Sequence, residues 1–187
     1  MKNRIILICL VLFAASVKNS SAQFEVGDNI IGAGIGFGSS LLGSGAYSNS
    51  TPGLSVQYER GNWDVGGPGV ISLGGYLGYK SYTYDNIYYD ARWTYVILGL
   101  RSAYHYTGFD NKQWDPYGGL MLSYSFADYS YESNITGFQY GGDTYGNHMS
   151  LSLYLGSRYY FSSQWSAFAE LGYGISFLSL GAAYKIP

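Results

Sequence analysis

Apolar residues alternate with small or polar residues in short stretches along most of the chain, and turn-forming residues separate these stretches. The clearest stretch spans 177–186, and its apolar side carries Leu178, Leu180, Ala182, Tyr184 and Ile186. The other side carries Phe177, Ser179, Gly181, Ala183 and Lys185. A β-strand turns successive side chains to opposite faces, so this stretch predicts a strand with one apolar face.

Eight stretches of this kind follow one another, and we therefore predict eight β-strands. Their expected bounds are about 29–39, 53–61, 69–81, 93–106, 115–126, 147–161, 165–174 and 177–186. The connections alternate in length: the short ones are 61–67, 107–113 and 162–164, and the others are 39–52, 82–92, 127–146 and a tight turn at 175–176. Short turns at one end and mostly longer loops at the other are typical of outer-membrane barrels.

The composition favours a membrane barrel over a soluble one. Charged residues make up only 12% of the chain, which holds 22 tyrosines and 27 glycines. A soluble β-sandwich or lipocalin-like barrel needs a more highly charged outer shell. Only helices and closed barrels satisfy every backbone polar group in lipid, and no stretch after residue 22 is long and apolar enough for a membrane helix. We predict an all-β fold, an eight-stranded antiparallel up-and-down transmembrane β-barrel. Its inner-wall glycines would leave room for bulky side chains from the opposite wall.

The first 22 residues have the features of a secretory signal peptide. Lys2 and Arg4 precede the apolar run 5–15, and small or polar residues follow up to Ala22. We expect cleavage after Ala22, which leaves residues 23–187 as the outer-membrane β-barrel domain. The single cysteine, Cys9, lies in the cleaved segment, so no disulfide is expected in the mature chain.

Six charged residues fall inside predicted strands on the face away from lipid: Glu59, Lys80, Arg101, Arg158, Glu170 and Lys185. An arginine or lysine facing lipid would cost roughly 2–4 kcal/mol at the bilayer midplane. We interpret these residues as a polar network inside the barrel, with Lys80 and Lys185 nearer its ends. The alternative interpretation is an ion path.

Tryptophans lie beside the predicted connections, as two aromatic girdles at the membrane interfaces would require: Trp63, Trp114 and Trp165 beside the short turns, and Trp93 beside a long loop. The long loops are rich in tyrosine, which offers a large contact area at low entropic cost. Candidate contact residues are Tyr84, Tyr88, Tyr129 and Tyr140. The alternative is that these rings extend a girdle or pack the hairpins against each other.

With these eight predicted strands, the chain resembles the small eight-stranded outer-membrane barrels of the OmpA and OmpX type, the outer-membrane-protein β-barrel domain group. Segments 61–82, 114–119 and 170–186 carry the resemblance together with the eight strands. The alternation from Leu178 to Ile186 also resembles the sorting signal read by the barrel-assembly machinery. Such signals usually end in phenylalanine, whereas this chain ends Lys185-Ile186-Pro187.

The resemblance implies a multi-pass protein of the bacterial outer membrane with both termini in the periplasm. Its expected partners are outer-membrane lipid, the barrel-assembly machinery and an extracellular ligand or host surface. We expect a non-enzymatic structural or surface-interaction role through the Tyr-rich loops. A formal net charge of −2 without a basic run argues against nucleic acid as a partner. No motif for a metal or another cofactor is present.

Two other functions stay open. The first is a narrow pore for small solutes, although Tyr76, Tyr95, Tyr117, Tyr154 and Phe168 would obstruct it. The second is a lipid A-modifying hydrolase, because His148 and Ser150 look like the His-x-Ser pair of outer-membrane lipid A deacylases. No glutamate follows at the spacing those enzymes use, and the strand alternation turns both residues inward.

Overall fold

The computed structural model describes residues 23–38, 49–85, 87, 89–133, 146–172 and 176–187. Over these residues the chain forms β1 (Asn29–Phe37), β2 (Asn49–Ser50), β3 (Gly53–Asp64), β4 (Gly69–Asp85), β5 (Tyr89–Tyr106), β6 (Trp114–Ser133), β7 (His148–Tyr160), β8 (Trp165–Gly172) and β9 (Leu178–Ile186). None of the described segments is a helix long and apolar enough to cross a bilayer.

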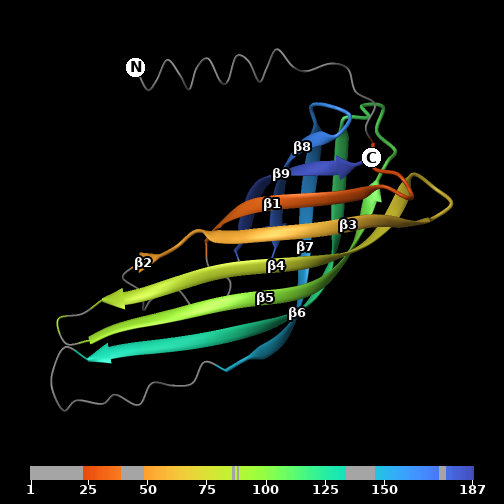
Figure 1. The fold of residues 1–187 in the computed structure, drawn as a ribbon. Coiled ribbons are helices and arrows are strands. Elements are labelled where there is room, and N and C mark those ends of the chain that lie inside the picture. Colours follow the sequence, from red (N-terminus) through yellow and green to blue (C-terminus); the bar gives the residue numbers. More distant parts are fainter. Residues whose placement is uncertain (1–22, 39–48, 86, 88, 134–145, 173–175) are drawn as a thin grey trace, which may run out of the picture.

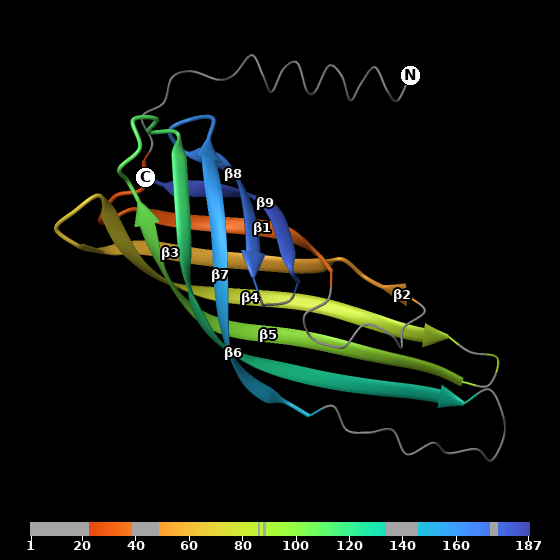
Figure 2. The same ribbon diagram turned by 180° about the vertical axis from the view of Figure 1, so that it is seen from behind.

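Eight of these strands form a closed antiparallel ring, shown from two sides in Figures 1 and 2. Each pairs with its neighbours in chain order, and β1 pairs with β9 to close the ring, for example at Ala33 and Ala182. The short β2 stands apart because it pairs only with the end of β4. The predicted eight-stranded up-and-down barrel is therefore confirmed.

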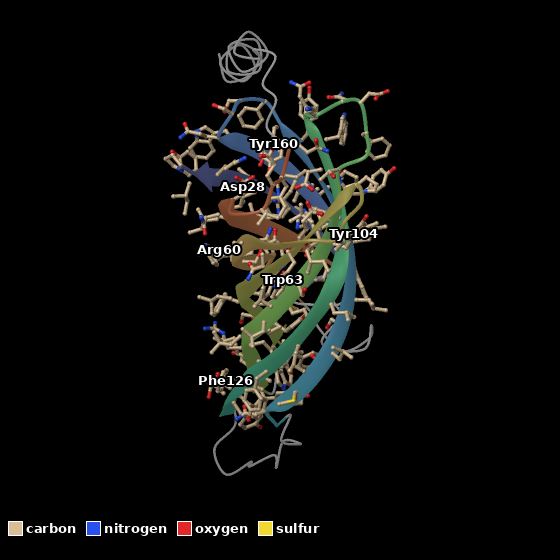
Figure 3. All side chains as sticks on the ribbon, turned by 90° about the vertical axis from the view of Figure 1, so that its right-hand side faces the viewer. Asp28, Arg60, Trp63, Tyr104, Phe126 and Tyr160 are labelled. Carbon is tan, nitrogen blue, oxygen red and sulfur yellow. The ribbon has the colours of Figure 1, made fainter. Side chains whose placement is uncertain are left out.

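One end of the barrel carries the connections 65–68, 107–113 and 161–164, and we call it the turn end. The opposite end is the loop end. In Figure 3, Asp28 and Tyr160 lie toward the turn end and Phe126 lies toward the loop end. Side chains alternate between the two faces of the wall as the sequence pattern predicts. On β1, for example, Ile31 and Ile35 are exposed on the outer wall.

Three strands are longer than expected. β4, β5 and β6 continue past the other strands at the loop end, and Figure 1 shows them extending to the lower left. The pairing of β6 with β7 stops at Ser125 and His148, but β5 and β6 stay paired as far as Tyr89 and Ser133. The expectation that 82–85, 89–92 and 127–133 form loops is therefore wrong. The residues Gly78, Ile97 and Ser125 are paired across β4, β5 and β6. We call the part of these three strands beyond this row, toward the loop end, the projection.

Glycines of the inner wall accommodate large aromatic rings, but the rings come from neighbouring strands. Tyr117 lies over Gly156 and Phe168 lies over Gly181, and each residue is paired directly with its glycine across the ladder. A Cβ atom at either glycine would collide with the ring. The sequence-based expectation of rings from the opposite wall is corrected at these two positions, because the rings lie flat along the wall.

The segment before β1 closes the turn end. Gly27 N–H donates to the Gly61 carbonyl at 2.8 Å, and Gly61 N–H donates to the Asp28 carbonyl at 3.0 Å. These bonds hold Phe24 in the mouth of the barrel, where it is fully buried among Ile30, Val70, Tyr160, Phe168 and Ala183.

Candidate functional site

Glu59 lies at the centre of the barrel interior, between two arginines. Its Oε1 lies 3.0 Å from Arg101 Nε, and its Oε2 lies 2.5 Å from Arg158 Nη2. All three side chains are buried, with 1%, 1% and 0% of their surface exposed. Strands β3, β5 and β7 supply them, so this contact connects three parts of the wall.

Arg101 has further partners that account for most of its donors. Its Nη2 lies 2.7 Å from Glu170 Oε2, and its Nη1 donates to Gln57 Oε1 at 2.6 Å. Its guanidinium also lies 4.1 Å from the centre of the Tyr154 ring, a favourable cation–π arrangement. Tyr117 donates its hydroxyl to Glu170 at 3.2 Å. Paired charges and satisfied donors are what the burial of an arginine requires.

The network continues toward the turn end through a residue absent from the sequence-based set. Arg158 Nη1 lies 3.3 Å from Asp115 Oδ2, and the other oxygen of Asp115 lies 2.8 Å from His105 Nδ1. The Nε2 atom of His105 lies 3.0 Å from Ser72 Oγ. Phe24 stacks on the His105 ring with centroids 4.0 Å apart.

Ser72, His105 and Asp115 have the connectivity of a hydrolytic triad, yet the surroundings do not fit an active site. All three are buried, and Phe24 covers the histidine. The Asp115 carboxylate also forms an ion pair with Arg158. A nucleophile needs space for a reacting carbonyl and donors for its oxyanion. This cluster therefore belongs to the packed interior.

Sequence reasoning missed Gln57, His105 and Asp115, although the alternation contained the signal. Each lies an even number of residues from a residue already assigned to the inner face of the same strand. These reference residues are Glu59 for Gln57, Arg101 for His105 and Tyr117 for Asp115. His105 and Asp115 stand close to predicted turns.

Lys80 and Lys185 lie apart from this network. Lys80 is buried near the loop end, where it donates to the Gly38 carbonyl and lies 3.5 Å from Ser176 Oγ. Lys185 forms an ion pair with Asp28 at 2.6 Å near the turn end, and 21% of its side chain is exposed.

Three of the four tryptophans face outward at the turn end. Trp63, Trp114 and Trp165 are each about half exposed, and the last two pack against Tyr159 and Tyr184 of adjacent strands. Trp93 differs from the expectation of a second girdle. It lies on the inner face of the projection, paired with Tyr82 and Tyr129, because its position has the same parity as Tyr95 and Arg101.

The projection reverses the polarity of the two faces. On the outer wall of the barrel, the last apolar row consists of Tyr79, Val96 and Phe126, which are paired across three strands. Beyond it, the outer positions are polar or charged: Ser81, Thr83, Asp90, Arg92, Thr94, Asp128 and Ser130. The inner positions there are mostly aromatic: Tyr82, Tyr84, Tyr89, Trp93, Tyr95, Tyr129 and Tyr131.

These aromatic side chains pack in rows across the strands. Tyr89 contacts Tyr84 and Tyr131, with ring centroids 5.6 and 5.5 Å apart. Trp93 contacts Tyr129 at 5.3 Å. Of the candidate contact residues, Tyr84 and Tyr129 thus lie on strands, where they are half-buried. Tyr88 and Tyr140 lie outside the described residues.

The two candidate hydrolase residues lie at the loop end of β7. His148 is exposed at the start of β7, and the Ser150 hydroxyl lies 2.9 Å from that of Ser123. In the described part of the chain, no three His, Cys, Asp or Glu side chains are grouped so that they could hold a metal ion.

The fold has counterparts among solved structures. Ail, the attachment invasion locus protein of Yersinia pestis, solved in complex with the heparin analogue sucrose octasulfate, shares 14% identity at a TM-score of 0.51, over 87% of this chain and 100% of that one. The outer membrane protein OprG from Pseudomonas aeruginosa shares 16% identity at a TM-score of 0.57, over 88% and 98%. No protein-family model and no curated protein sequence matches the chain. The predicted resemblance to small eight-stranded outer-membrane barrels is therefore confirmed for the fold.

Proposed function

We propose that the protein is a non-enzymatic barrel of the bacterial outer membrane that anchors the projection outside the cell as a contact surface. The reversal of polarity along β4–β6 carries this proposal. Apolar side chains cover the outer wall as far as the row of Tyr79, Val96 and Phe126, and charged side chains begin within the next two rows. A barrel wall in contact with hydrocarbon needs apolar outer side chains, whereas a sheet in water tolerates charged ones.

The orientation follows from the two ends. The turn end, with its short connections and outward tryptophans, faces the periplasm, and the loop end faces the outside. Both termini of the mature chain then lie in the periplasm, after removal of residues 1–22. Assembly would use the barrel-assembly machinery, which reads the alternating segment that ends at Ile186.

A sealed interior favours an anchor over a pore. Arg101 and Arg158 expose 1% and 0% of their side chains, whereas a water-filled channel would leave its charged lining accessible. Phe24 also fills the mouth at the turn end. Planar-bilayer recordings should therefore show no conductance steps, and a reproducible channel would favour the pore.

The projection suits a partner without high negative charge. Ail was solved with a polyanionic heparin analogue. Here the outer face of the projection carries Asp90 and Asp128 with Arg92, and the inner face is mostly aromatic, with the buried Lys80 as its one cation among the described residues. We expect the projection to bind an uncharged or weakly cationic surface better than a polyanionic one.

Cysteine accessibility tests placement directly, because the mature chain has no cysteine of its own. Ser130→Cys lies on the outer face of the projection, and Lys112→Cys lies in an exposed turn at the turn end. A membrane-impermeant maleimide added to intact cells should label only Ser130→Cys, and both variants after permeabilisation. Recovery of the protein in the soluble fraction, or labelling of Lys112→Cys on intact cells, would overturn the placement.

Attachment tests the contact role. Cells that carry the protein should be retained on epithelial monolayers, and the variant Tyr84→Ser/Tyr129→Ser/Tyr131→Ser should lose that retention. The control variant Asp90→Ala/Ser130→Ala changes the opposite face of the same strands. A heat-modifiable band on a gel confirms that each barrel is folded. Equal retention of all three proteins would rule out the aromatic face.

A further inference from the structure

A separate cavity opens on the outer wall at the turn end. It has a volume of about 540 Å³ and is lined by Phe109, Asp110, Asn111, Trp114, Pro116 and Ser157. The first three belong to the connection between β5 and β6, and the others belong to the wall of β6 and β7. Its lining includes Trp114, one of the outward tryptophans, and shares no residue with the interior network or the projection.

The local sequence explains why the wall is hollow here. Pro116 and Ser157 are paired across β6 and β7, and both have small side chains, whereas Trp114, Leu155 and Tyr159 on the same face have large ones. Asn111 fixes the turn above this floor, since its Oδ1 accepts from Gln113 N–H at 3.0 Å and its carbonyl accepts from Trp114 N–H at 3.2 Å. Phe109 is held by an edge-to-face contact with Tyr106 at 5.2 Å.

The chemistry of the lining favours a cation of organic type. Two aromatic side chains, Phe109 and Trp114, stand about half exposed beside the carboxylate of Asp110. Aromatic faces and a carboxylate together attract ammonium groups. None of the described lining residues is cationic, so nothing in the lining competes with such a ligand.

We propose that this cavity binds the ammonium head of a phosphatidylethanolamine molecule. This inference rests on the proposed membrane placement, which puts Trp114 at the level of the lipid head groups in the periplasmic leaflet. Asp110 and the two rings receive the ammonium, and Pro116 and Ser157 leave room for it against the wall. Lys112, exposed in the same turn, supplies a positive charge for the lipid phosphate.

Native mass spectrometry of the folded barrel in detergent tests the cavity without depending on where the protein resides in the cell. The probes are dioleoyl phosphatidylethanolamine and dioleoyl phosphatidylglycerol, which have the same acyl chains but differ in the ammonium group. We expect the wild type to retain the ethanolamine lipid about five-fold more than the glycerol lipid, the ratio expected from one exposed cation–aromatic contact. Soluble glycerophosphoethanolamine serves as the head-group competitor.

Two variants test the cavity by different means. Asp110→Asn removes the charge at nearly constant shape, and Ser157→Leu fills the floor with a side chain suited to the outer wall. Both should abolish the preference, and Glu25→Gln, an exposed carboxylate at the same end, should retain it. Equal retention of the two lipids by the wild type, or an unchanged preference in both cavity variants, would overturn the proposal. Displacement of the ethanolamine lipid by excess soluble head group is expected for binding through the ammonium, and complete resistance to it would overturn the proposal. The cysteine-labelling experiment reports separately on the membrane placement.

Discussion

Glu59 and Arg158 join opposite sides of the barrel. Their strands, β3 and β7, lie four steps apart in either direction around the eight-stranded ring, and the two side chains meet at 2.5 Å. A single ion pair therefore spans the full width of the interior. Because Arg101 contacts the same carboxylate, two buried cations share Glu59, and each has a second carboxylate partner, Glu170 for Arg101 and Asp115 for Arg158.

Glu59→Gln should strongly destabilise the barrel. The change removes the carboxylate that both buried guanidiniums share and leaves each with a single carboxylate partner, Glu170 or Asp115. Removal of one partner from a buried ion pair costs about 3–5 kcal/mol. The free energy of unfolding in urea, measured in lipid vesicles, provides the test. Asp90→Asn, an exposed carboxylate of the projection, should shift it by less than about 0.5 kcal/mol. A loss for Glu59→Gln as small as that of the control would show that the pair contributes little.

Phe24→Ala should also lower stability, through a different contact. Phe24 is fully buried between His105 and the cluster of Ile30 and Tyr160 at the turn end. Truncation of a buried phenylalanine costs about 3–5 kcal/mol. Val26→Ala, two residues later and exposed, is the matched control, and urea unfolding again measures both. Similar values for the two variants would mean that the segment before β1 does not hold the mouth closed.

A pair of arginine substitutions on one strand tests the apolar boundary. Leu122 and Asp128 lie on the same outer face of β6, on either side of the row that contains Phe126. Leu122→Arg should cost about 2–4 kcal/mol in a bilayer, whereas Asp128→Arg should cost about 0–1 kcal/mol. Unfolding in vesicles of defined thickness gives both values. If the two costs were the same, the boundary would lie elsewhere.

Trp93→Ala should loosen the projection and leave the barrel intact. Trp93 packs between Tyr82 and Tyr129 at the centre of the aromatic rows, so its loss should speed amide exchange in 82–85 and 127–133. Amides of β8 and β9 should keep their protection. Arg92→Ala, on the opposite face, is the control. Uniform acceleration over all strands would show that the projection and barrel unfold as one unit.

Strand order, ring closure and the assignment of faces could be predicted because the two-residue period of a strand is visible over each stretch. The projection could not be predicted in this way, because the apolar side of its strands changes from the outer to the inner face beyond Phe126. The run of outward apolar residues that marks each predicted strand therefore ends at that row. Trp93 was misplaced for the same reason. The alternation predicts Glu59, Arg101, Arg158 and Glu170 in one interior network, but not which of them pair, because the relative heights of β3 and β7 depend on the stagger of the closed ring. Phe24 precedes the first strand and carries no periodic signal.

With the proposed membrane placement, the change of polarity on three adjacent strands also limits the depth at which the barrel can lie in the bilayer. A shift outward or inward by one residue pair would take either the tryptophans of the turn end or Asp128 and Arg92 out of their preferred surroundings. The immersion depth is thus determined on both sides, and the lipid must adapt to the protein. In a bilayer thicker than this apolar band, we expect the membrane to thin around β4–β6.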